Sequence, residues 1–374
     1  MGNKKVLLVY ASIGAGHEKA CKALEEAFKS IGVDTITEDF ISNTPRALRL
    51  IIKDTYLQII KYIPEAYDLA YRFTLHMDIK EAQGLARFIS LTGYPFFKSM
   101  FERVSPDIVI STHPLTTIGF SMIKRKDAPN LRLINVLTDF HILNLFLAQG
   151  VNFHTVPNEH LLENYKNKYR RNVPLILPLG VPVSLNFLKN VDIYEARKLL
   201  GFNNDEKIVL VMAGGLGLSG IVEVAETIVD VSFKEKITIV FLAGKNEKTL
   251  RELSRVKGEK VGANRILYIP WTEDVWLYMK AVNMLISKAG GVTIAEAALC
   301  GLPLVIYRPL PGQERINANF LNSHSAAIVA KNKEELPEFV NKVLFEGHDK
   351  ILRENIIKLA KPNASLDIAR KSLE

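Results

Sequence analysis

The sequence predicts an α/β protein built from two doubly wound domains in tandem. Its 374 residues suffice for two domains of ordinary size. Short runs rich in Val, Ile and Leu alternate with amphipathic segments along the whole chain, as expected of βαβ units and parallel sheets. Glycine-rich turns follow strand candidates in both halves, at the position where such folds bind ligands.

Each expected strand is a short apolar run bounded by turn residues, and the segments between strands have helical periodicity. Residues 175–183 are rich in Pro and Gly and form the expected linker. We therefore place an N-terminal domain at 1–182 and a C-terminal domain at 183–354, and we expect a final helix near 355–374 to pack back on the first domain. The expected strands are 5–10, 34–39, 108–111, 131–138, 208–212, 237–242, 265–269, 284–287 and 303–307.

Residues 44–101 interrupt this alternation. Apolar residues from Leu48 to Ile63 follow helical spacing with Arg and Lys between them, and an aromatic cluster that includes Phe96 and Phe97 follows. Two interpretations stay open. The segment is either a buried helical hairpin or a basic amphipathic surface that lies on anionic lipid.

Composition excludes several classes of protein. With 48% hydrophobic and 24% charged residues, the chain is an ordinary globular one. Two cysteines cannot form a disulfide framework, so we expect a reducing cytosol. The sequence contains no run of about 18 apolar residues, the length that a bilayer span requires, and no recognisable secretory signal. The net charge of +8 leaves an anionic partner open: nucleic acid, anionic lipid or a phosphorylated substrate.

The first glycine-rich motif, Ala11–His17, follows the first expected strand. Gly14 and Gly16 let the backbone approach a ligand closely. The dinucleotide-binding pattern G-x-G-x-x-G requires a third glycine where Lys19 stands, so that pattern fails. His17 falls in the first turn of a helix, where the helix dipole disfavours a cation, and a neutral imidazole there can act as a base. An ordinary solvated histidine remains the alternative.

Two further glycine-rich turns lie in the second half. Residues 212–220 hold four glycines within seven residues, which indicates a close approach to a ligand or to the facing domain. In the other turn, Gly290 and Gly291 precede a helix whose backbone N–H groups can hold a diphosphate. Glu296 lies on the same helix face as Thr293 and can accept hydrogen bonds from ribose hydroxyls. A capping box made by Thr293 and Glu296 would use the same spacing and remains the alternative.

The last motif follows the next strand and is rich in polar side chains suited to sugar hydroxyls. Gln313, Glu314 and Asn317 supply amide and carboxylate groups for such hydrogen bonds. The chain has no Asp-x-Asp sequence and no His and Cys cluster with metal-ligand spacing. We therefore expect no metal: helix dipoles and backbone donors would take the place of a divalent ion.

Taken in order, these motifs resemble the family 28 glycosyltransferases of the GT-B fold. Among them, the bacterial processive diacylglycerol β-glucosyltransferases and the plant monogalactosyldiacylglycerol synthases match best. The resemblance implies two Rossmann-like domains that face each other across a cleft. The segments that carry it are Ala11–His17, Ser105–Ile110, Val136–Phe140, Gly290–Ala297, Pro311–Glu314 and Asn317–Phe320.

The resemblance also implies where each substrate binds. The C-terminal domain would hold a UDP-sugar and the N-terminal domain a lipid acceptor. Relatives often carry an arginine near the phosphates at the linker, but Ser184 stands there, which leaves backbone donors or another cation such as Lys245. The implied contacts are uracil at Trp271 and Thr272, diphosphate at Gly290, Gly291, Val292 and Thr293, ribose at Glu296, sugar at Gln313, Glu314 and Asn317, and acceptor at His17, Asp139, Gly14 and Gly16.

The activity that follows is transfer of a hexose from a UDP-sugar to diacylglycerol with inversion, giving a β-glycolipid. UDP-glucose is the favoured donor and UDP-galactose the second choice. We expect no cofactor and no nucleic-acid partner, and a peripheral location on the anionic inner face of the cell membrane. The alternatives are transfer of GlcNAc from its UDP derivative to a lipid-diphosphate precursor of peptidoglycan, and a non-catalytic nucleotide-binding module.

Overall fold

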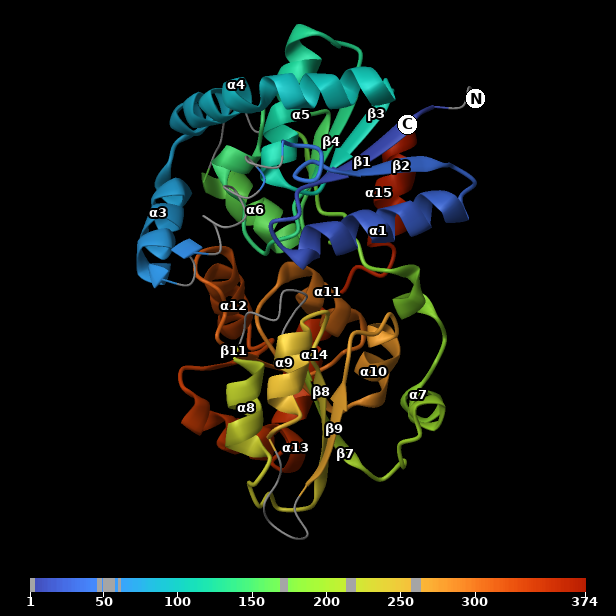
Figure 1. Cartoon of the computed structure of the whole chain (residues 1–374), viewed down its shortest axis with the longest axis vertical. Coiled ribbons are helices and arrows are strands. Elements are labelled where there is room, and N and C mark those ends of the chain that lie inside the picture. Colours follow the sequence, from blue (N-terminus) through green and yellow to red (C-terminus); the bar gives the residue numbers. More distant parts are fainter. Residues whose placement is uncertain are drawn as a thin grey trace. The chain divides into compact units, whose positions relative to one another are not determined.

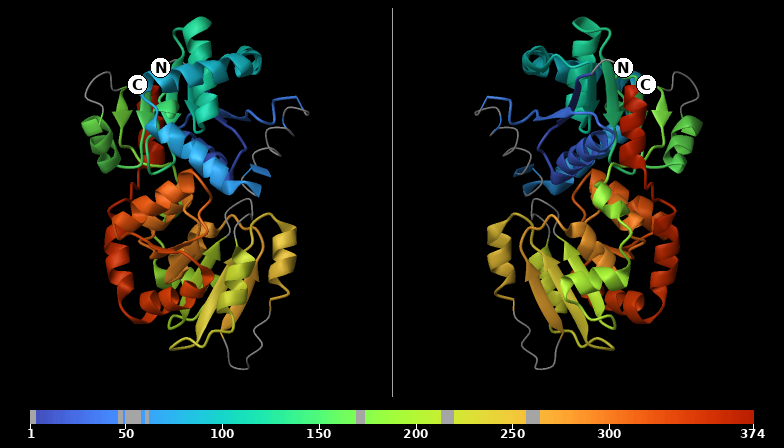
Figure 2. Two further views of the ribbon diagram at one scale, coloured as in Figure 1. Left: turned by 90° about the vertical axis from the view of Figure 1, so that its left-hand side faces the viewer. Right: turned by 90° about the vertical axis from the view of Figure 1, so that its right-hand side faces the viewer.

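The computed structural model describes residues 4–45, 49, 58–59, 62–168, 174–212, 220–256 and 264–374. The chain divides into two compact units. Within the described residues, each unit holds a parallel sheet of six strands, with helices on both faces (Figures 1 and 2). The expected class of two doubly wound domains is confirmed. The first unit comprises residues 1–185, 311–313 and 361–374, and the second comprises 186–310 and 314–360.

The first sheet has the strand order β2-β1-β3-β4-β5-β6. The chain runs from β1 outward to β2 and then returns to β3 on the other side of β1, so the strand order reverses between β1 and β3. In open parallel sheets, ligands bind outside the carboxyl ends of the strands at such a reversal. The strands are β1 (Val6–Tyr10), β2 (Thr35–Asp39), β3 (Ile108–Ser111), β4 (Arg132–Val136), β5 (Phe153–Thr155) and β6 (Ile176–Leu177).

Alternate residues of β1 face two different helix layers. Val6 and Leu8 pack in a cluster with residues of α1 (Ala15–Ser30) and α15 (Ala364–Leu373). Leu7 and Val9 pack in a second cluster with residues of α4 (Ile79–Val104) and α5 (Pro114–Lys126). This is the period-two alternation of a strand buried on both faces. The same unit also contains α3 (Pro64–His76), η1 (Asn144–Phe146), α6 (Glu159–Lys168) and η2 (Leu185–Leu188), whose last residues fall in the second unit.

The second sheet has the order β12-β11-β10-β7-β8-β9, so its reversal lies between β7 and β10. Its strands are β7 (Lys207–Met212), β8 (Ile237–Leu242), β9 (Arg265–Ile269), β10 (Met284–Ser287), β11 (Leu304–Tyr307) and β12 (Ile328–Ala330). Its helices are α7 (Ile193–Leu200), α8 (Ile221–Ile228), α9 (Glu247–Leu253), α10 (Val275–Ala281), α11 (Gly291–Leu299), α12 (Gln313–Ser323), η3 (Lys333–Glu335), α13 (Leu336–Phe345) and α14 (His348–Ile357).

The nine strands expected from the sequence are all present, but β5, β6 and β12 are additional. Each of these three has only two or three residues, too few to show a period. The expected linker at 175–183 was therefore partly wrong, because its first residues form β6 and pair with β5. The boundary between the units falls at 185–186. The last helix, α15, packs against α1 in the first unit.

The segment 44–101 combines buried and exposed parts. Its stretches 46–48, 50–57 and 60–61, with Leu48 and most of the expected basic positions, lie outside the described residues. The end of α4 is core: Phe97 is fully buried and stacks on Phe40 with ring centroids 4.1 Å apart. Earlier in α4, Phe88 is 66% exposed. The interpretation of the whole aromatic cluster as a lipid-facing surface was therefore wrong for Phe97.

Close packing of α4 on α5 around Phe97 yields a stability prediction. A Cβ added to Gly119 on α5 would lie 2.2 Å from Cε2 of the Phe97 ring, which is fully buried and stacks on Phe40. Gly119→Ala should destabilise the protein by about 1–3 kcal/mol, as overpacking does. Gly84→Ala is the matched control, because a Cβ at this exposed helical position meets no atom within 4 Å. It should stabilise by roughly 0.5–1 kcal/mol. Thermal unfolding of both variants checks the pair, and equal effects would contradict the packing.

Candidate active site

The carboxyl edge of the first sheet brings His17 against the end of β3. His17 is half-buried in the first turn of α1. Its Nδ1 lies 2.5 Å from the carbonyl oxygen of Thr112, and the Thr112 hydroxyl donates to the His17 carbonyl at 3.0 Å. Since a carbonyl only accepts, Nδ1 of His17 carries the proton. In the neutral ring Nε2 is then left with its lone pair, so it is the atom that can accept a proton.

In His113, the residue after Thr112, the proton lies on the other ring nitrogen. Its Nδ1 accepts a hydrogen bond from the backbone N–H of Leu115 at 3.1 Å, which caps α5. In the neutral ring the proton is therefore on Nε2. The two imidazoles meet edge to face with centroids 4.6 Å apart. A proton acceptor on His17 and a proton donor on His113 thus belong to neighbouring rings.

Burial keeps both rings neutral. Desolvation lowers the pKa of His17, and the negative charge of Asp139 raises that pKa to a smaller extent. Desolvation also places the pKa of His113 well below its usual value, and a charge on His17 would lower it further. The sequence analysis predicted a neutral His17 from the helix dipole, and the structure adds burial as a cause. His17 and Asp139, both predicted from the sequence, are coupled electrostatically.

The loop before α1 is fixed by backbone conformation and by one carboxylate. Gly14, the N-cap residue, has a φ of 146°, which side chains disfavour, although a Cβ there would meet no atom within 4 Å. Gly16 follows within the first turn of α1. Asp39 accepts from the backbone N–H of Ser12 at 3.0 Å. The Asp39 carboxylate therefore holds this loop.

At the carboxyl edge of the second sheet, α11 starts without a side-chain cap. Gly290 is its N-cap residue, and the first turn consists of Gly291, Val292 and Thr293. No acidic residue lies in this turn, and the N-cap residue supplies no side-chain cap. The capping box of Thr293 with Glu296 is thereby excluded, because it would require Thr293 at the N-cap. The open backbone N–H groups form the arrangement that binds anions.

Two side chains of α12 hold the loop between β10 and α11. Lys288 Nζ lies 2.6 Å from Oε1 of Glu314, and Oε2 of Glu314 accepts from the Leu310 N–H at 2.9 Å. The amide of Asn317, which is fully buried, donates to the Ala289 carbonyl at 3.0 Å. The third residue predicted there, Gln313, begins α12. Asn317 thus supports the loop.

The residues that the sequence analysis expects at the uracil follow other strands of the same edge. Trp271 is the second residue after β9 and is 48% exposed. Lys245, which follows β8, places its Nζ 4.9 Å from the Trp271 ring centroid. Thr272 accepts from the Asp274 N–H at 3.1 Å, just before α10. Glu296 lies inside α11 and is 5% exposed.

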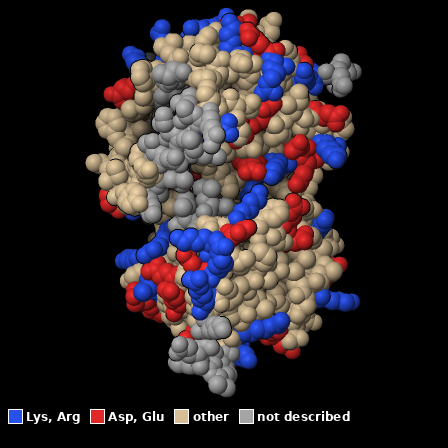
Figure 3. All heavy atoms as spheres, viewed as in Figure 1, with Lys and Arg blue, Asp and Glu red and all other residues tan. Residues whose placement is uncertain are grey.

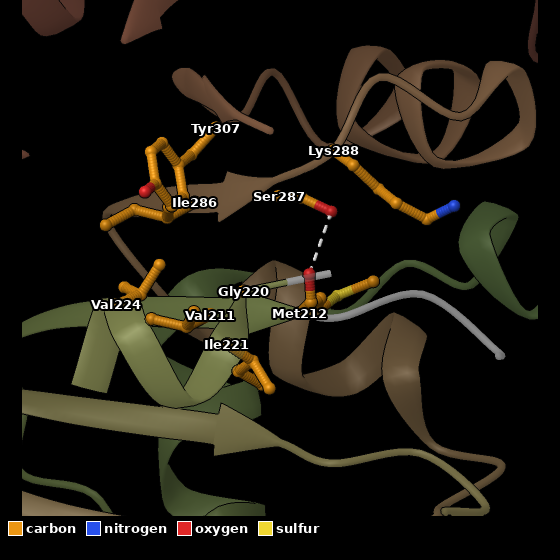
Figure 4. A pocket seen from close by; sticks show the side chains of 9 residues that line it. All are labelled: Val211, Met212, Gly220, Ile221, Val224, Ile286, Ser287, Lys288 and Tyr307. Carbon is orange, nitrogen blue, oxygen red and sulfur yellow. Dashed lines mark hydrogen bonds between the residues drawn. The ribbon is translucent and has the colours of Figure 1, made fainter. Parts of the chain in front are cut away.

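A small hollow lies at the strand reversal between β7 and β10 (Figure 4). Ser287 donates to the Met212 carbonyl at 3.2 Å and closes one side of it. Lys288 lies at its rim, with the ammonium pointing away from the apolar lining side chains. The glycine motif at 212–220 borders this hollow through Met212 and Gly220, and residues 213–219 lie outside the described residues.

Three general features of the described residues bear on chemistry. They contain no group of three or more His, Cys, Asp or Glu side chains placed to hold a metal ion. None of their helices combines the length and hydrophobicity that crossing a bilayer requires. On the face that Figure 3 shows, their Lys and Arg side chains are interspersed with Asp and Glu.

Sequence reasoning did not single out Thr112, His113 or Lys288. A signal was available for His113, since Thr112 and His113 follow a buried strand and Pro114 begins the next helix. Lys288 lies two residues before Gly290, but its partner Glu314 belongs to the motif that follows the next strand.

Comparison with known families agrees with this arrangement. Residues 17–183 match the family model of monogalactosyldiacylglycerol (MGDG) synthase. Residues 208–370 match that of the glycosyltransferase family 28 C-terminal domain. Together the two matches identify the chain as a glycosyltransferase that is similar to family 28. The expected resemblance is confirmed, and the boundary between the two matches coincides with the boundary between the two sheets.

Relatives of this glycosyltransferase cover nearly its whole length. It is 29% identical over 358 residues to a processive diacylglycerol β-glucosyltransferase of Bacillus cytotoxicus, covering 94% of this chain and 88% of the relative. A Bacillus mycoides protein of the same description is 29% identical, covering 89% and 84%. Among solved structures, MurG of Acinetobacter baumannii has a TM-score of 0.63 at 17% identity, covering 99% of both chains. Arabidopsis thaliana UGT89C1 has 0.58 at 13%, covering 99% and 100%. These likenesses establish the GT-B fold.

The state of the two histidines is directly testable. At pH 6 an ordinary histidine, with a pKa near 6.5, is mostly protonated. Because burial lowers their pKa values, His17 and His113 should be less protonated at this pH than an ordinary histidine, and their neutral forms should carry the proton on Nδ1 of His17 and on Nε2 of His113. Ring nitrogen NMR shifts, assigned through His17→Asn and His113→Asn variants, measure both properties. Titration of either ring near pH 6.5 would contradict the burial argument.

Proposed function

We propose that this glycosyltransferase moves a hexose from a UDP-sugar to the free hydroxyl of diacylglycerol, with inversion at the anomeric carbon. The observation that carries the proposal is the order of the two family matches, an MGDG synthase domain followed by a family 28 C-terminal domain. UDP-glucose is the favoured donor, because the relatives are described as β-glucosyltransferases. UDP-galactose is the second choice, because the first domain matches an MGDG synthase.

On the acceptor side, His17 is the proposed base. The acceptor oxygen attacks the anomeric carbon while the bond from that carbon to the diphosphate oxygen breaks. The hydroxyl proton passes to Nε2 of His17, whose lone pair is kept available by the Nδ1 bond to Thr112. Asp139 stabilises the imidazolium that forms. An α-linked donor then gives a β-glycolipid and UDP.

On the donor side, the start of α11 is the proposed diphosphate site. The backbone N–H groups of Gly291, Val292 and Thr293 point toward charge that develops on the leaving UDP. No metal ion is required in this proposal. Trp271 and Thr272 would hold the uracil, Glu296 the ribose, and Gln313, Glu314 and Asn317 the sugar and the loop that faces it.

The peptidoglycan alternative has less support. The likeness to MurG is at 17% identity and indicates the fold alone. The relatives at 29% identity are described as diacylglycerol glucosyltransferases, and the N-terminal match is to an MGDG synthase. A lipid-diphosphate acceptor therefore ranks below diacylglycerol.

A membrane-facing surface is the proposed route to the lipid acceptor. Leu69 and Phe73 on α3 are 71% and 67% exposed, and Phe88 and Leu91 on α4 are 66% and 51% exposed. Arg87, next to Phe88, is also exposed. Exposed apolar side chains beside basic ones are typical of surfaces that lie on anionic lipid. We place this surface on the inner face of the cell membrane.

One assay tests the reaction. Wild-type protein is incubated with anionic vesicles that contain either diacylglycerol or a lipid-diphosphate acceptor, and with UDP-glucose, UDP-galactose or UDP-GlcNAc, with and without EDTA. We expect a β-hexosyl diacylglycerol, most from UDP-glucose, at an unchanged rate in EDTA. A product formed only on a lipid-diphosphate acceptor would reject the proposed acceptor. Loss of activity in EDTA, restored by Mg²⁺ or Mn²⁺, would reject the metal-independent phosphate site.

The base assignment predicts a split between binding and turnover. His17→Ala should lower turnover by roughly 10²- to 10⁴-fold, the usual contribution of general-base catalysis. Its affinity for UDP should stay unchanged, because the proposed UDP site belongs to the second sheet. Asp139→Asn is the companion variant and should lower turnover less than His17→Ala does. If His17→Ala keeps more than about a tenth of wild-type turnover, Asp139 becomes the proposed base.

Membrane contact predicts a selective loss of vesicle binding. Phe73→Ser with Phe88→Ser removes two exposed aromatic side chains, each worth roughly 1.5–3 kcal/mol when buried in an apolar phase. Co-sedimentation with anionic vesicles should drop by more than about tenfold, while UDP binding persists. Ile351→Ser is the matched control, because this exposed apolar residue lies in α14 of the second unit. Equal losses in the control and the double variant would contradict the proposed surface.

A further inference from the structure

A row of polar side chains crosses the first sheet just below its carboxyl edge. Ser111 on β3, Asn135 on β4 and His154 on β5 are paired in register, and all three are buried. Two residues earlier on the same face, the paired residues Val109 and Leu133 are apolar and belong to the core. Burying polar groups is costly unless they find hydrogen-bond partners. The helix α5, which packs on β3 and β4, supplies several of these partners.

The neighbours of the Asn135 amide define its orientation. Its Nδ2 donates to the Phe146 carbonyl at 2.8 Å and lies 2.9 Å from Nδ1 of His154. Burial lowers the pKa of His154 to about 3, so this ring stays neutral and its Nδ1 can accept from the amide. The amide oxygen then accepts from the hydroxyl of Thr117 on α5, at 2.8 Å. Asn135 therefore fixes the direction in which Thr117 donates.

Three hydroxyls meet at the carbonyl oxygen of His113, the N-cap residue of α5. We call Ser111, Thr116 and Thr117 the hydroxyl cluster. Their oxygens lie 3.0, 2.8 and 3.2 Å from this carbonyl oxygen. The Ser111 oxygen also lies 2.6 Å from that of Thr116 and 2.8 Å from that of Thr117. Since Ser111 ends β3 and the threonines lie in the first turn of α5, the cluster ties the strand to the helix across the turn between them.

That turn contains Thr112, whose carbonyl binds His17. The Thr112 N–H donates to the Val9 carbonyl at 3.1 Å, so the sheet holds the peptide before Thr112. The hydroxyl cluster holds the carbonyl of the next residue, His113. Between these two fixed points, the Thr112 carbonyl accepts from Nδ1 of His17. Its direction therefore decides which nitrogen of His17 carries the proton.

We propose that the hydroxyl cluster, together with Asn135, positions the ring of His17 for proton transfer. This deepens the proposed function and rests on His17 as the base. Stability alone does not require such a cluster, because apolar groups of the same shape in place of both partners of a hydrogen bond can be equally stable. Catalysis does require exact placement, since a displacement of about 1 Å can lower a rate by about 10²-fold.

Thr117→Val tests the role of the cluster, because it replaces a hydroxyl by a methyl group of similar size. Turnover should fall by roughly tenfold or more, while the affinity for UDP, measured by calorimetry, stays unchanged. Thr117→Ser keeps the hydroxyl and should retain most of the turnover. Ser111→Ala, a milder change that frees the same carbonyl from the strand side, should show the same selective loss and guards against a folding defect in Thr117→Val.

The matched control is Ser121→Ala. Ser121 is buried one turn further along α5 and donates to the Gln149 carbonyl, so this variant also removes a buried hydrogen bond from the same helix. It should lower the unfolding temperature as the cluster variants do, but it should keep wild-type turnover. Wild-type turnover in Thr117→Val and Ser111→Ala, or an equal loss of turnover in Ser121→Ala, would overturn the proposal.

Ring nitrogen NMR tests the positioning without relying on activity. In the wild type the neutral ring of His17 should carry its proton on Nδ1, whereas in Thr117→Val and Ser111→Ala part of the population should carry it on Nε2. An unchanged tautomer in both folded variants would overturn the proposal. Failure of the wild type to transfer a hexose to diacylglycerol would instead overturn the proposed function, and the tautomer would still decide whether the cluster orients the ring.

Discussion

All strands of a parallel sheet end at one edge, and this constraint gathers the candidate functional residues of this chain. In the first sheet the chain leaves β1 and returns at β3, so the turn before α1 and the turn after β3 become neighbours. His17 and Thr112 meet there although 95 residues separate them. The second sheet repeats the arrangement, and its edge carries the residues that follow β8, β9, β10 and β11: Lys245, Trp271, Gly290 and Glu314.

Sequence patterns predicted the central strands well because these strands are buried on both faces. Runs such as Ile237–Leu242, with every residue buried, leave a continuous apolar signal bounded by turns. The short edge and near-edge strands leave no such signal. β6 has two residues, and its pairing depends on the position of β5, which sequence periodicity cannot supply. These short strands are therefore defined by their pairing with neighbouring strands in the folded sheet.

The sequence predicted the parts of the site that need glycine for a backbone conformation. It predicted less well the side-chain pairs whose members are far apart in the sequence. Gly14 and Gly290 were recognisable, because glycine before a helix indicates a backbone requirement. The start of α11 was ambiguous from spacing alone, and only its observed N-cap distinguishes an open helix end from a capping box. The Lys288–Glu314 pair joins loops after two different strands. Phe88 and Phe97 share one helix, but the packing of α5 decides which of them is buried.

Burial sets a compromise at His17. Desolvation lowers the pKa of the ring, so the neutral form that can take a proton predominates at neutral pH. The same effect makes the ring a weaker base, and catalysis is most effective when the pKa lies near the working pH. Asp139 acts against desolvation by favouring the charged form. Its carboxylate therefore offsets part of the cost of charging a buried imidazole, while the bond to Thr112 fixes which nitrogen is available. Removing Asp139 would leave a ring that is correctly oriented but harder to protonate, so orientation and basicity at this edge depend on different residues.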